Sequence, residues 1–154
     1  MIRLSKLTDY AFVILFAFLK ESENVISVSH ISDRTSLPEP TVSKILKTLC
    51  RNNILESQRG VNGGYSLLKP AEDIVVGEVV EMFEGPIALT TCVDTNSENC
   101  ALEGICELNG KWSGLNNEIR QLFYARTLTD MMSQTQNPLG THSYKAVNHQ
   151  DKRC

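Results

Sequence analysis

The chain has 154 residues, of which 42% are hydrophobic, enough for one domain with a core or for a small domain with an extension. Residues 1–70 carry nine Lys or Arg and six Asp or Glu, whereas residues 71–154 carry six and twelve, so only the first part suits an anionic partner. The longest apolar run, residues 11–19, is about half of a ~20-residue membrane span, and no secretory signal opens the chain, so we expect a soluble cytoplasmic protein.

The chain begins with two predicted helices. Apolar side chains recur at helical spacing over residues 5–21, which predicts a buried amphipathic helix. A shorter helix is expected over residues 29–36, and the hydroxyl of Ser27 or Ser29 can cap it by accepting a hydrogen bond from a free N–H of the first turn.

Two prolines separate the second helix from a third. Pro38 disfavours a helical conformation in the residue before it, and Pro40 suits the first turn of a new helix that runs to about Asn52. The second and third helices therefore predict a helix-turn-helix. The polar residues of the third helix point away from the core and are Thr41, Ser43, Lys44, Lys47 and Arg51. They are of the types that read a DNA groove, although a solvated helix face also carries such residues.

A hairpin is predicted to follow the third helix. Residues 54–58 read as a strand, residues 59–64 as a glycine-rich turn and residues 65–68 as the returning strand. The combination indicates a winged helix, a mainly α-helical fold with a small β-hairpin. The residues of this wing that we expect to contact DNA are Arg59, Asn62, Gly63, Gly64 and Tyr65. A plain hairpin without a DNA contact is the alternative.

Residues 71–110 are expected to form a short helix, over residues 77–84, and a cysteine loop. A long helix is predicted over residues 111–132, within a dimerisation segment that we place at residues 111–133. Its apolar residues are Trp112, Leu115, Ile119, Leu122 and Phe123. We interpret this stripe as the contact with a second copy of the chain, the alternative being that it packs on its own winged domain. Residues 134–154 are polar, lack periodicity and predict a disordered tail.

Three cysteines mark a candidate metal site. Cys92, Cys100 and Cys106 lie within fifteen residues of one another, and thiolates are the natural ligands of iron-sulfur clusters and of zinc. A disulfide framework is disfavoured, because five cysteines is an odd number and the expected compartment is reducing. We treat Cys50 and Cys154 as uninvolved.

A winged helix with a metal site suggests a metal-dependent DNA-binding regulator, and two other classes of function compete with this interpretation. In one, the chain is a winged-helix regulator whose cysteines hold a structural zinc or no metal, and regulation comes from a partner molecule or from nitric oxide or redox stress. A redox enzyme is disfavoured, because the chain has no Cys-x-x-Cys pair and His30 is the only histidine before the tail.

Four features follow one another along the chain: LSKLTDYA at residues 4–11, RGVNGGYSL at 59–67, VGEVV at 76–80 and the three cysteines. Together they resemble the IscR/NsrR family of bacterial winged-helix repressors, which hold an iron-sulfur cluster. The segment EGPIALT at residues 84–90 is most similar to the branch that regulates the SUF operon for iron-sulfur cluster assembly.

The resemblance implies a homodimer that binds a palindromic operator in double-stranded DNA. It also implies that Cys92, Cys100 and Cys106 are thiolate ligands of a two-iron or four-iron cluster, located between the cysteine loop and the winged domain. Cluster occupancy would then set the angle between the two winged domains, and thus the half-site spacing that they span. Under this hypothesis, cluster shortage releases repression of the assembly genes.

The fourth ligand does not carry over directly from the resemblance. Members of the IscR type have a histidine three residues after the last cysteine, where this chain has Asn109. Members of the NsrR type use an acidic residue in the first helix of the partner subunit, and Asp9 stands at the matching position. Asp9 is therefore the candidate, with a helix cap or a salt bridge as its alternative role. Other possible ligands are Glu103, Glu107 and His30.

Overall fold

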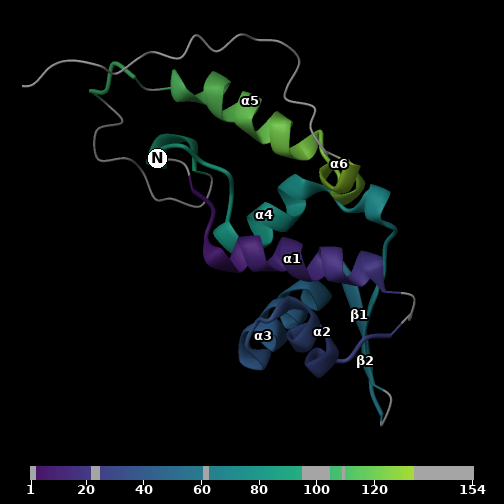
Figure 1. Ribbon diagram of the computed structural model, residues 1–154. Helices are drawn as coiled ribbons and strands as arrows, with labels where there is room; N and C mark the ends of the chain where they lie inside the picture. Colours follow the sequence, from purple (N-terminus) through teal and green to yellow (C-terminus); the bar gives the residue numbers. More distant parts are fainter. Residues whose placement is uncertain (1–2, 22–24, 61–62, 95–104, 109, 134–154) are drawn as a thin grey trace, which may run out of the picture.

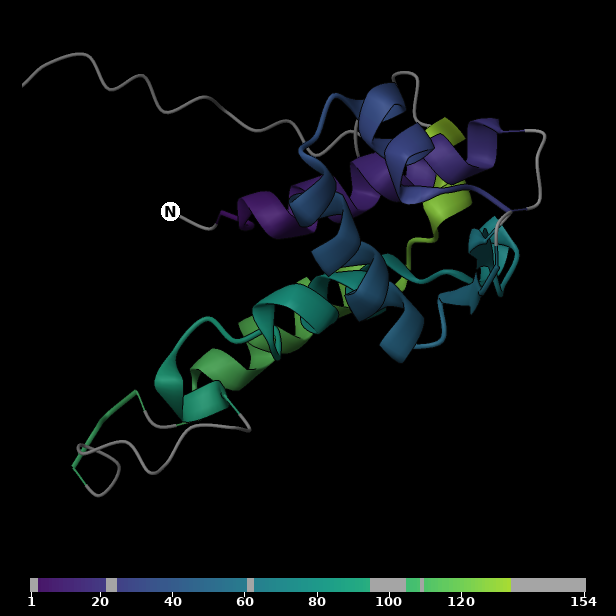
Figure 2. The same cartoon turned by 90° about the horizontal axis from the view of Figure 1, so that it is seen from below.

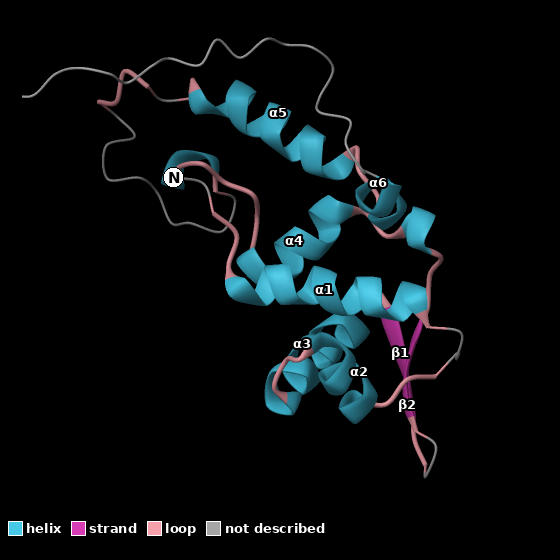
Figure 3. Ribbon diagram, viewed as in Figure 1, coloured by secondary structure: helices cyan, strands magenta, loops and turns pink. Residues whose placement is uncertain are grey.

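A computed structural model describes residues 3–21, 25–60, 63–94, 105–108 and 110–133. Helix α1 (Lys6–Lys20) runs through the middle of the molecule (Figure 1). On one side of it lie two helices and a two-stranded sheet, and on the other side lie the three remaining helices (Figure 3). These elements are α2 (Val28–Thr35), α3 (Glu39–Arg51), β1 (Leu55–Gln58), β2 (Gly64–Leu67), α4 (Val76–Glu84), α5 (Trp112–Tyr124) and α6 (Leu128–Ser133), with two short 3₁₀ helices, η1 (Ala71–Asp73) and η2 (Thr91–Val93).

The core forms because α1 buries apolar side chains on both of its sides. Ile14 and Leu15 are fully buried, and they belong to one cluster with Ile45 and Leu46 of α3 and with Val79 of α4. Burial of a side chain of this size stabilises the fold by about 1.5–3 kcal/mol. The helix begins at Ser5, whose hydroxyl accepts a hydrogen bond from the Thr8 N–H at 3.3 Å. The predicted buried amphipathic helix is confirmed.

The helix-turn-helix is confirmed as well. Ser27, and not Ser29, caps α2, because its Oγ accepts a hydrogen bond from the His30 N–H at 3.2 Å. The helix ends at Thr35, and the φ of 58° at the next residue, Ser36, turns the backbone out of the helical path. Pro40 lies in the first turn of α3, where a missing N–H costs nothing.

The wing is an antiparallel pair in which Leu55 lies opposite Leu67 and Gln58 lies opposite Gly64. Its second strand also pairs with the chain that enters α2, because Ile26 and Tyr65 exchange two backbone hydrogen bonds of 2.9 Å each. A side chain at position 64 would bring a Cβ within 2.4 Å of the Ile26 carbonyl oxygen. Gly64 is therefore required for the sheet to approach α2. The predicted winged-helix fold is confirmed.

The predicted single helix over residues 111–132 is wrong, because the structure has two helices there. The backbone leaves α5 after Tyr124 and pairs with the start of α4, where the Val76 N–H donates to the Arg126 carbonyl oxygen at 2.9 Å. A new helix, α6, then begins with a reciprocal cap. The Thr127 N–H donates to the Asp130 carboxylate at 2.8 Å, and the Asp130 N–H donates to the Thr127 hydroxyl at 3.3 Å.

Helix α5 packs on α4 and on η2, and it extends away from α2 and α3 toward one end of the molecule (Figure 2). The approach of α4 and α5 is close, since a Cβ on Gly77 would lie 2.5 Å from the ring of Tyr124. Among the described helices, none combines the length and the apolar character needed to cross a lipid bilayer.

Candidate functional site

The exposed face of α3 carries three cations that have no ion-pair partner among the described residues. Lys44, Lys47 and Arg51 are exposed at positions that share one side of the helix, whereas Thr41 and Ser43 are half-buried beside them. The three cations form no ion pair with another residue in the described part of the chain. Their charges are therefore available to an external anion such as a phosphate.

The predicted DNA-contacting residues of the wing differ in how exposed they are. Arg59 is exposed just after β1, and Asn62 lies outside the described residues. Gly63 stands in the turn, where a Cβ would approach the Gln58 carbonyl oxygen to 2.7 Å, so its role there is structural. Tyr65 is half-buried with its side chain packed against the core. Of these residues, Arg59 is the one that the structure presents as an exposed charge.

The two described cysteines of the cysteine loop are free thiols. Cys92 lies in η2 and is exposed, and Cys106 is half-buried, while Cys100 lies outside the described residues. The Thr90 hydroxyl and the Cys92 sulfur are 3.1 Å apart. Cysteine thiolates fit a metal or an iron-sulfur cluster in their chemistry.

The other candidate ligands are dispersed. Asp9 is exposed in the first turn of α1, and Glu107 is exposed one residue after Cys106. His30 belongs to α2, where its Nε2 lies 3.2 Å from the carboxylate of Glu21. Glu103 and Asn109 lie outside the described residues. Within the part of the chain that the structure describes, no three His, Cys, Asp or Glu side chains gather closely enough to hold a metal ion.

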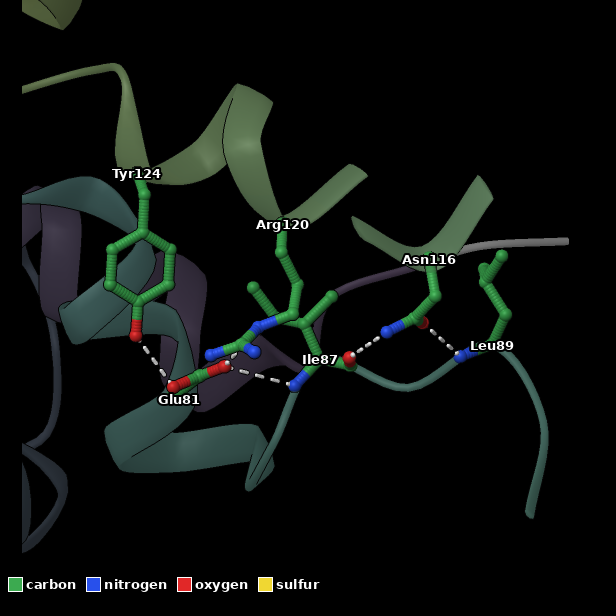
Figure 4. Close-up of polar contacts among 6 residues, drawn as sticks. All are labelled: Glu81, Ile87, Leu89, Asn116, Arg120 and Tyr124. Atoms are coloured by element: carbon green, nitrogen blue, oxygen red, sulfur yellow. Dashed lines mark hydrogen bonds and ion pairs between the residues drawn. The ribbon is translucent and has the colours of Figure 1, made fainter. Parts of the chain in front are cut away.

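The segment that leads to Cys92, residues 85–90, is fixed by polar side chains of the neighbouring helices (Figure 4). The carboxamide of Asn116, on α5, accepts a hydrogen bond from the Leu89 N–H at 2.9 Å and donates one to the Ile87 carbonyl oxygen at 3.1 Å. The carboxylate of Glu81, on α4, accepts a hydrogen bond from the Ile87 N–H at 3.2 Å. Both helices thus hold the same short stretch of backbone.

Glu81 is also held from α5. It accepts a hydrogen bond from the Tyr124 hydroxyl at 2.7 Å and lies 3.4 Å from the Arg120 Nε (Figure 4). The Glu81 carboxylate raises the pKa of Tyr124, because deprotonation would remove the donor and place two negative charges side by side. The guanidinium of Arg120 also lies 5.5 Å from the centre of the Tyr124 ring.

A second polar junction connects the end of α4 to the start of α1. Thr8 is fully buried and donates its hydroxyl hydrogen bond to the carboxylate of Glu84, which also accepts from the Ser5 N–H at 2.7 Å. These contacts hold the pKa of Glu84 below its ordinary value, with the Thr8 hydrogen bond as the largest cause. Because Glu84 directly precedes the segment at residues 85–90, the start of α1 and the start of the cysteine loop are joined.

An apolar groove of about 410 Å³ lies beside this junction. Phe12, Val13 and Phe16 of α1 form one wall, and Val80, Phe123 and Met131 come from α4, α5 and α6. Asp9 stands among the polar residues that also line it.

A separate apolar surface lies on α5, where Leu115 is 47% exposed and Leu122 is 59% exposed. The predicted stripe of α5 is therefore divided, since Phe123 packs against the core of its own chain while Leu115 and Leu122 remain exposed.

Together these features define a winged-helix, DNA-binding transcriptional regulator with an attached cysteine segment. The chain belongs to the Rrf2 family, whose model, described as an iron-dependent transcriptional regulator, matches residues 4–134. Members of this family are transcriptional regulators, which are generally not enzymes, and they typically bind DNA as dimers.

Relatives agree with this assignment, and solved structures agree with the fold. The HTH-type transcriptional regulator NsrR of Geobacillus kaustophilus is 30% identical over 131 residues, which is 84% of this chain and 89% of that protein. Protein aau3 of Rhizobium meliloti is 29% identical over 130 residues, 84% of each chain. CymR, the global cysteine regulator of B. subtilis, has a TM-score of 0.65 at 23% identity and covers 88% of this chain and all of its own. IscR of T. potens has a TM-score of 0.58 at 22% identity, covering 88% of this chain and 89% of that one.

Sequence reasoning did not identify the residues that hold the cysteine segment, namely Glu81, Glu84, Asn116, Arg120 and Tyr124. One of them left a signal. Asn116 occupies a core-facing position in the same helical series as Trp112, Ile119 and Phe123, and a polar residue in an apolar series requires a hydrogen-bonding partner. Nothing in the spacing indicated which backbone it would bind.

Proposed function

We propose that this chain is a homodimeric repressor that acts in the cytoplasm, senses iron-sulfur cluster status and controls genes of the SUF assembly system. One observation carries the proposal. In a member of a family described as iron-dependent, the free thiols of Cys92 and Cys106 flank a loop whose entry segment is hydrogen-bonded to α4 and α5. The assignment to SUF genes rests on the resemblance of residues 84–90.

The cysteine ligands supply three thiolates in this proposal, from Cys92, Cys100 and Cys106. Asp9 supplies an oxygen as the fourth ligand. When bound, the two-iron or four-iron cluster provides a centre that reacts with oxygen or nitric oxide, and an oxygen ligand leaves it more open to this attack than a fourth thiolate would. The exposure of Cys92 and Asp9 suits a site that forms and is lost in response to conditions.

A second copy of the chain explains how Asp9 reaches the cysteines. The groove between α1, α4 and α6 and the exposed stripe of Leu115 and Leu122 on α5 are both apolar, and each is left open in one chain. If the stripe of one subunit occupies the groove of the other, both surfaces are removed from water. This arrangement brings the polar rim of the groove, where Asp9 stands, toward α5 and the cysteine segment of the partner.

DNA is contacted by α3 and by the wing in this proposal. Lys44, Lys47 and Arg51, with Arg59 of the wing, supply cations to phosphates, while Thr41 and Ser43 of α3 and Asn62, Gly63, Gly64 and Tyr65 of the wing complete the surface. Two copies related by a twofold axis would address half-sites of a palindromic operator about one helical turn, ~34 Å, apart. The spacing between the two α3 helices then decides affinity.

The chain itself transmits the state of the site. The segment at residues 85–90 contacts α5 through Asn116, and its first neighbour, Glu84, contacts α1 through Ser5 and Thr8. A movement of this segment therefore acts on the dimerisation helix and on the central helix of the winged domain. Both helices determine how the two copies of α3 are oriented.

The test combines composition with DNA binding. Protein purified without oxygen should be brown and contain iron and sulfide in similar amounts, and its affinity for an operator fragment from a SUF promoter, measured by fluorescence anisotropy, should change when the cluster is removed. Cys92→Ala and Cys106→Ala should abolish the difference in affinity. Cys50→Ala, which alters a half-buried thiol on α3, is the matched control. Colourless protein with one zinc per chain, or a cysteine variant that still responds to iron, would overturn the proposal in favour of a structural metal.

A further inference from the structure

The backbone of residues 86–89 has hydrogen bonds to only two side chains among the described residues. The N–H and the carbonyl of Ile87 and the N–H of Leu89 are each paired with Glu81 or Asn116. No helix or strand includes these residues. The side chain of Ile87 packs against the core, and the polar contacts of this backbone come from Glu81 and Asn116 and not from secondary structure (Figure 4).

Glu81 and Asn116 differ in the contacts that hold their own side chains in place. Glu81 is held by both Arg120 and Tyr124, so removal of either partner leaves the other in place. Asn116 is 5% exposed, and its two hydrogen bonds go to the segment alone. A carboxamide can donate and accept at once, and no other uncharged side chain of similar size offers both groups in this geometry.

We propose that Asn116 is a positioning residue that joins the segment carrying Cys92 to α5, so that the state of the cysteine site is read by the dimerisation helix. The inference rests on the proposed function for its link to DNA, but the hydrogen bonds themselves can be tested without any cluster. If Asn116 had only a structural role, its substitution would lower stability and would leave the regulatory response intact.

The first measurement concerns the metal-free protein. In Asn116→Leu, which has a similar volume but no polar atoms, the Leu89 amide loses its acceptor, and its hydrogen exchange by NMR should accelerate on the order of tenfold relative to wild type. Asn116→Asp retains an acceptor for Leu89 but lacks the donor to Ile87, so its Leu89 amide should exchange at a rate between the two. Asn117→Leu, the same change at the exposed neighbouring position of α5, should leave this amide unaffected.

The second measurement concerns regulation. The ratio of operator affinities between cluster-loaded and cluster-free protein should fall toward one in Asn116→Leu while its cluster content per chain and its dimeric mass stay at wild-type values. Asn117→Leu should retain the wild-type ratio. If Asn116→Leu does not fold, the same two measurements on Asn116→Asp decide the matter, with a partial loss of the ratio expected.

The outcomes separate the two ideas. A wild-type protein without a cluster, or with equal affinities in both states, contradicts the proposed function, and the coupling role of Asn116 falls with it even if the exchange of Leu89 behaves as expected. A wild-type protein that responds, together with an Asn116→Leu variant that responds equally, contradicts the positioning role alone. Unchanged exchange at Leu89 in Asn116→Leu overturns the inference directly.

Discussion

The winged domain and the segment before the cysteines, residues 85–90, are held in place in different ways. From α1 to β2 the elements are joined through fully buried aliphatic side chains such as Ile14, Ile45 and Leu46. In the segment before the cysteines, Ile87 is the one apolar residue that packs against this core, and the rest of the support comes from hydrogen bonds of Glu81, Glu84 and Asn116. An apolar core resists small displacements because it is close-packed, whereas a few hydrogen bonds can be exchanged for water at low net cost. We therefore expect the winged domain, which we propose as the DNA-contacting part, to be the more rigid part, and the segment before the cysteines to be the more adjustable one.

The largest effect is expected in the core. Leu46→Ala removes a fully buried side chain of α3 and should lower the free energy of unfolding by about 2–5 kcal/mol, as measured by urea denaturation. Leu68→Ala makes the same change at an exposed position and should stay within about 0.5 kcal/mol of wild type. Similar losses in both variants would contradict the description of the core.

Two glycines, one in α4 and one in α5, test how closely these two helices pack. Gly77→Ala places a Cβ against the ring of Tyr124, so either the ring or the two helices must move, and we expect a loss of about 1–3 kcal/mol in urea denaturation. Gly114→Ala, in an exposed helical position with no atom near the new Cβ, should instead stabilise α5 by up to about 1 kcal/mol. If both substitutions are neutral, the close approach of the two helices is wrong.

Charge removal on α3 should affect binding and leave stability nearly unchanged. Lys47→Ala should weaken operator binding a few-fold and reduce the steepness of its salt dependence by about 0.9 for each phosphate that the variant no longer neutralises, measured by anisotropy at several salt concentrations. Arg126→Ala removes an equal charge at the junction of α5 and α6 and serves as the control. An unchanged salt slope in Lys47→Ala would exclude this residue from the interface.

The smallest effect concerns the junction of Glu84 with α1. Its pKa is lower in the folded chain than the ordinary value of 4.5, so the ionised carboxylate stabilises the fold above that value and the contribution disappears as pH falls through the folded pKa. Because Glu84 is exposed, Glu84→Gln should cost less than about 1 kcal/mol at neutral pH, and the difference from wild type should shrink as the pH falls below 4.5. Glu72→Gln, which makes the same change at an exposed residue of η1, is the matched control.

The same contrast explains which parts of the fold could be predicted from the sequence. In the winged domain, apolar periodicity, the Ser27 cap and Pro40 are local signals, and the helices and strands lie within about two residues of their expected positions. The break between α5 and α6 has a local signal too, since Thr127 and Asp130 have the spacing of a reciprocal cap. The sequence analysis missed this signal because the helical spacing of apolar residues predicted one continuous helix over residues 111–132. What the sequence lacked was the pairing of Val76 with Arg126, a contact between distant residues.

The candidate site was predictable only in its chemistry. The cysteines and the cations of α3 could be found because their residue types carry a function regardless of where neighbouring elements lie. The partners of Asn116 could not be found, because Ile87 and Leu89 present backbone atoms that every residue possesses. The proposed role of Asp9 as a fourth ligand depends on contact with a second copy of the chain, and a local sequence pattern does not predict contacts between two chains.

The chain contains a single tryptophan, Trp112, and it is the first residue of α5, the helix that packs against η2. Its indole is half-buried and stands at the end of the molecule where the cysteine loop returns to the helix. Its fluorescence therefore comes from one known place and needs no attached label. An iron-sulfur chromophore nearby would quench this emission by energy transfer, so that loading and loss of the centre could be followed in real time by the light that the protein itself emits.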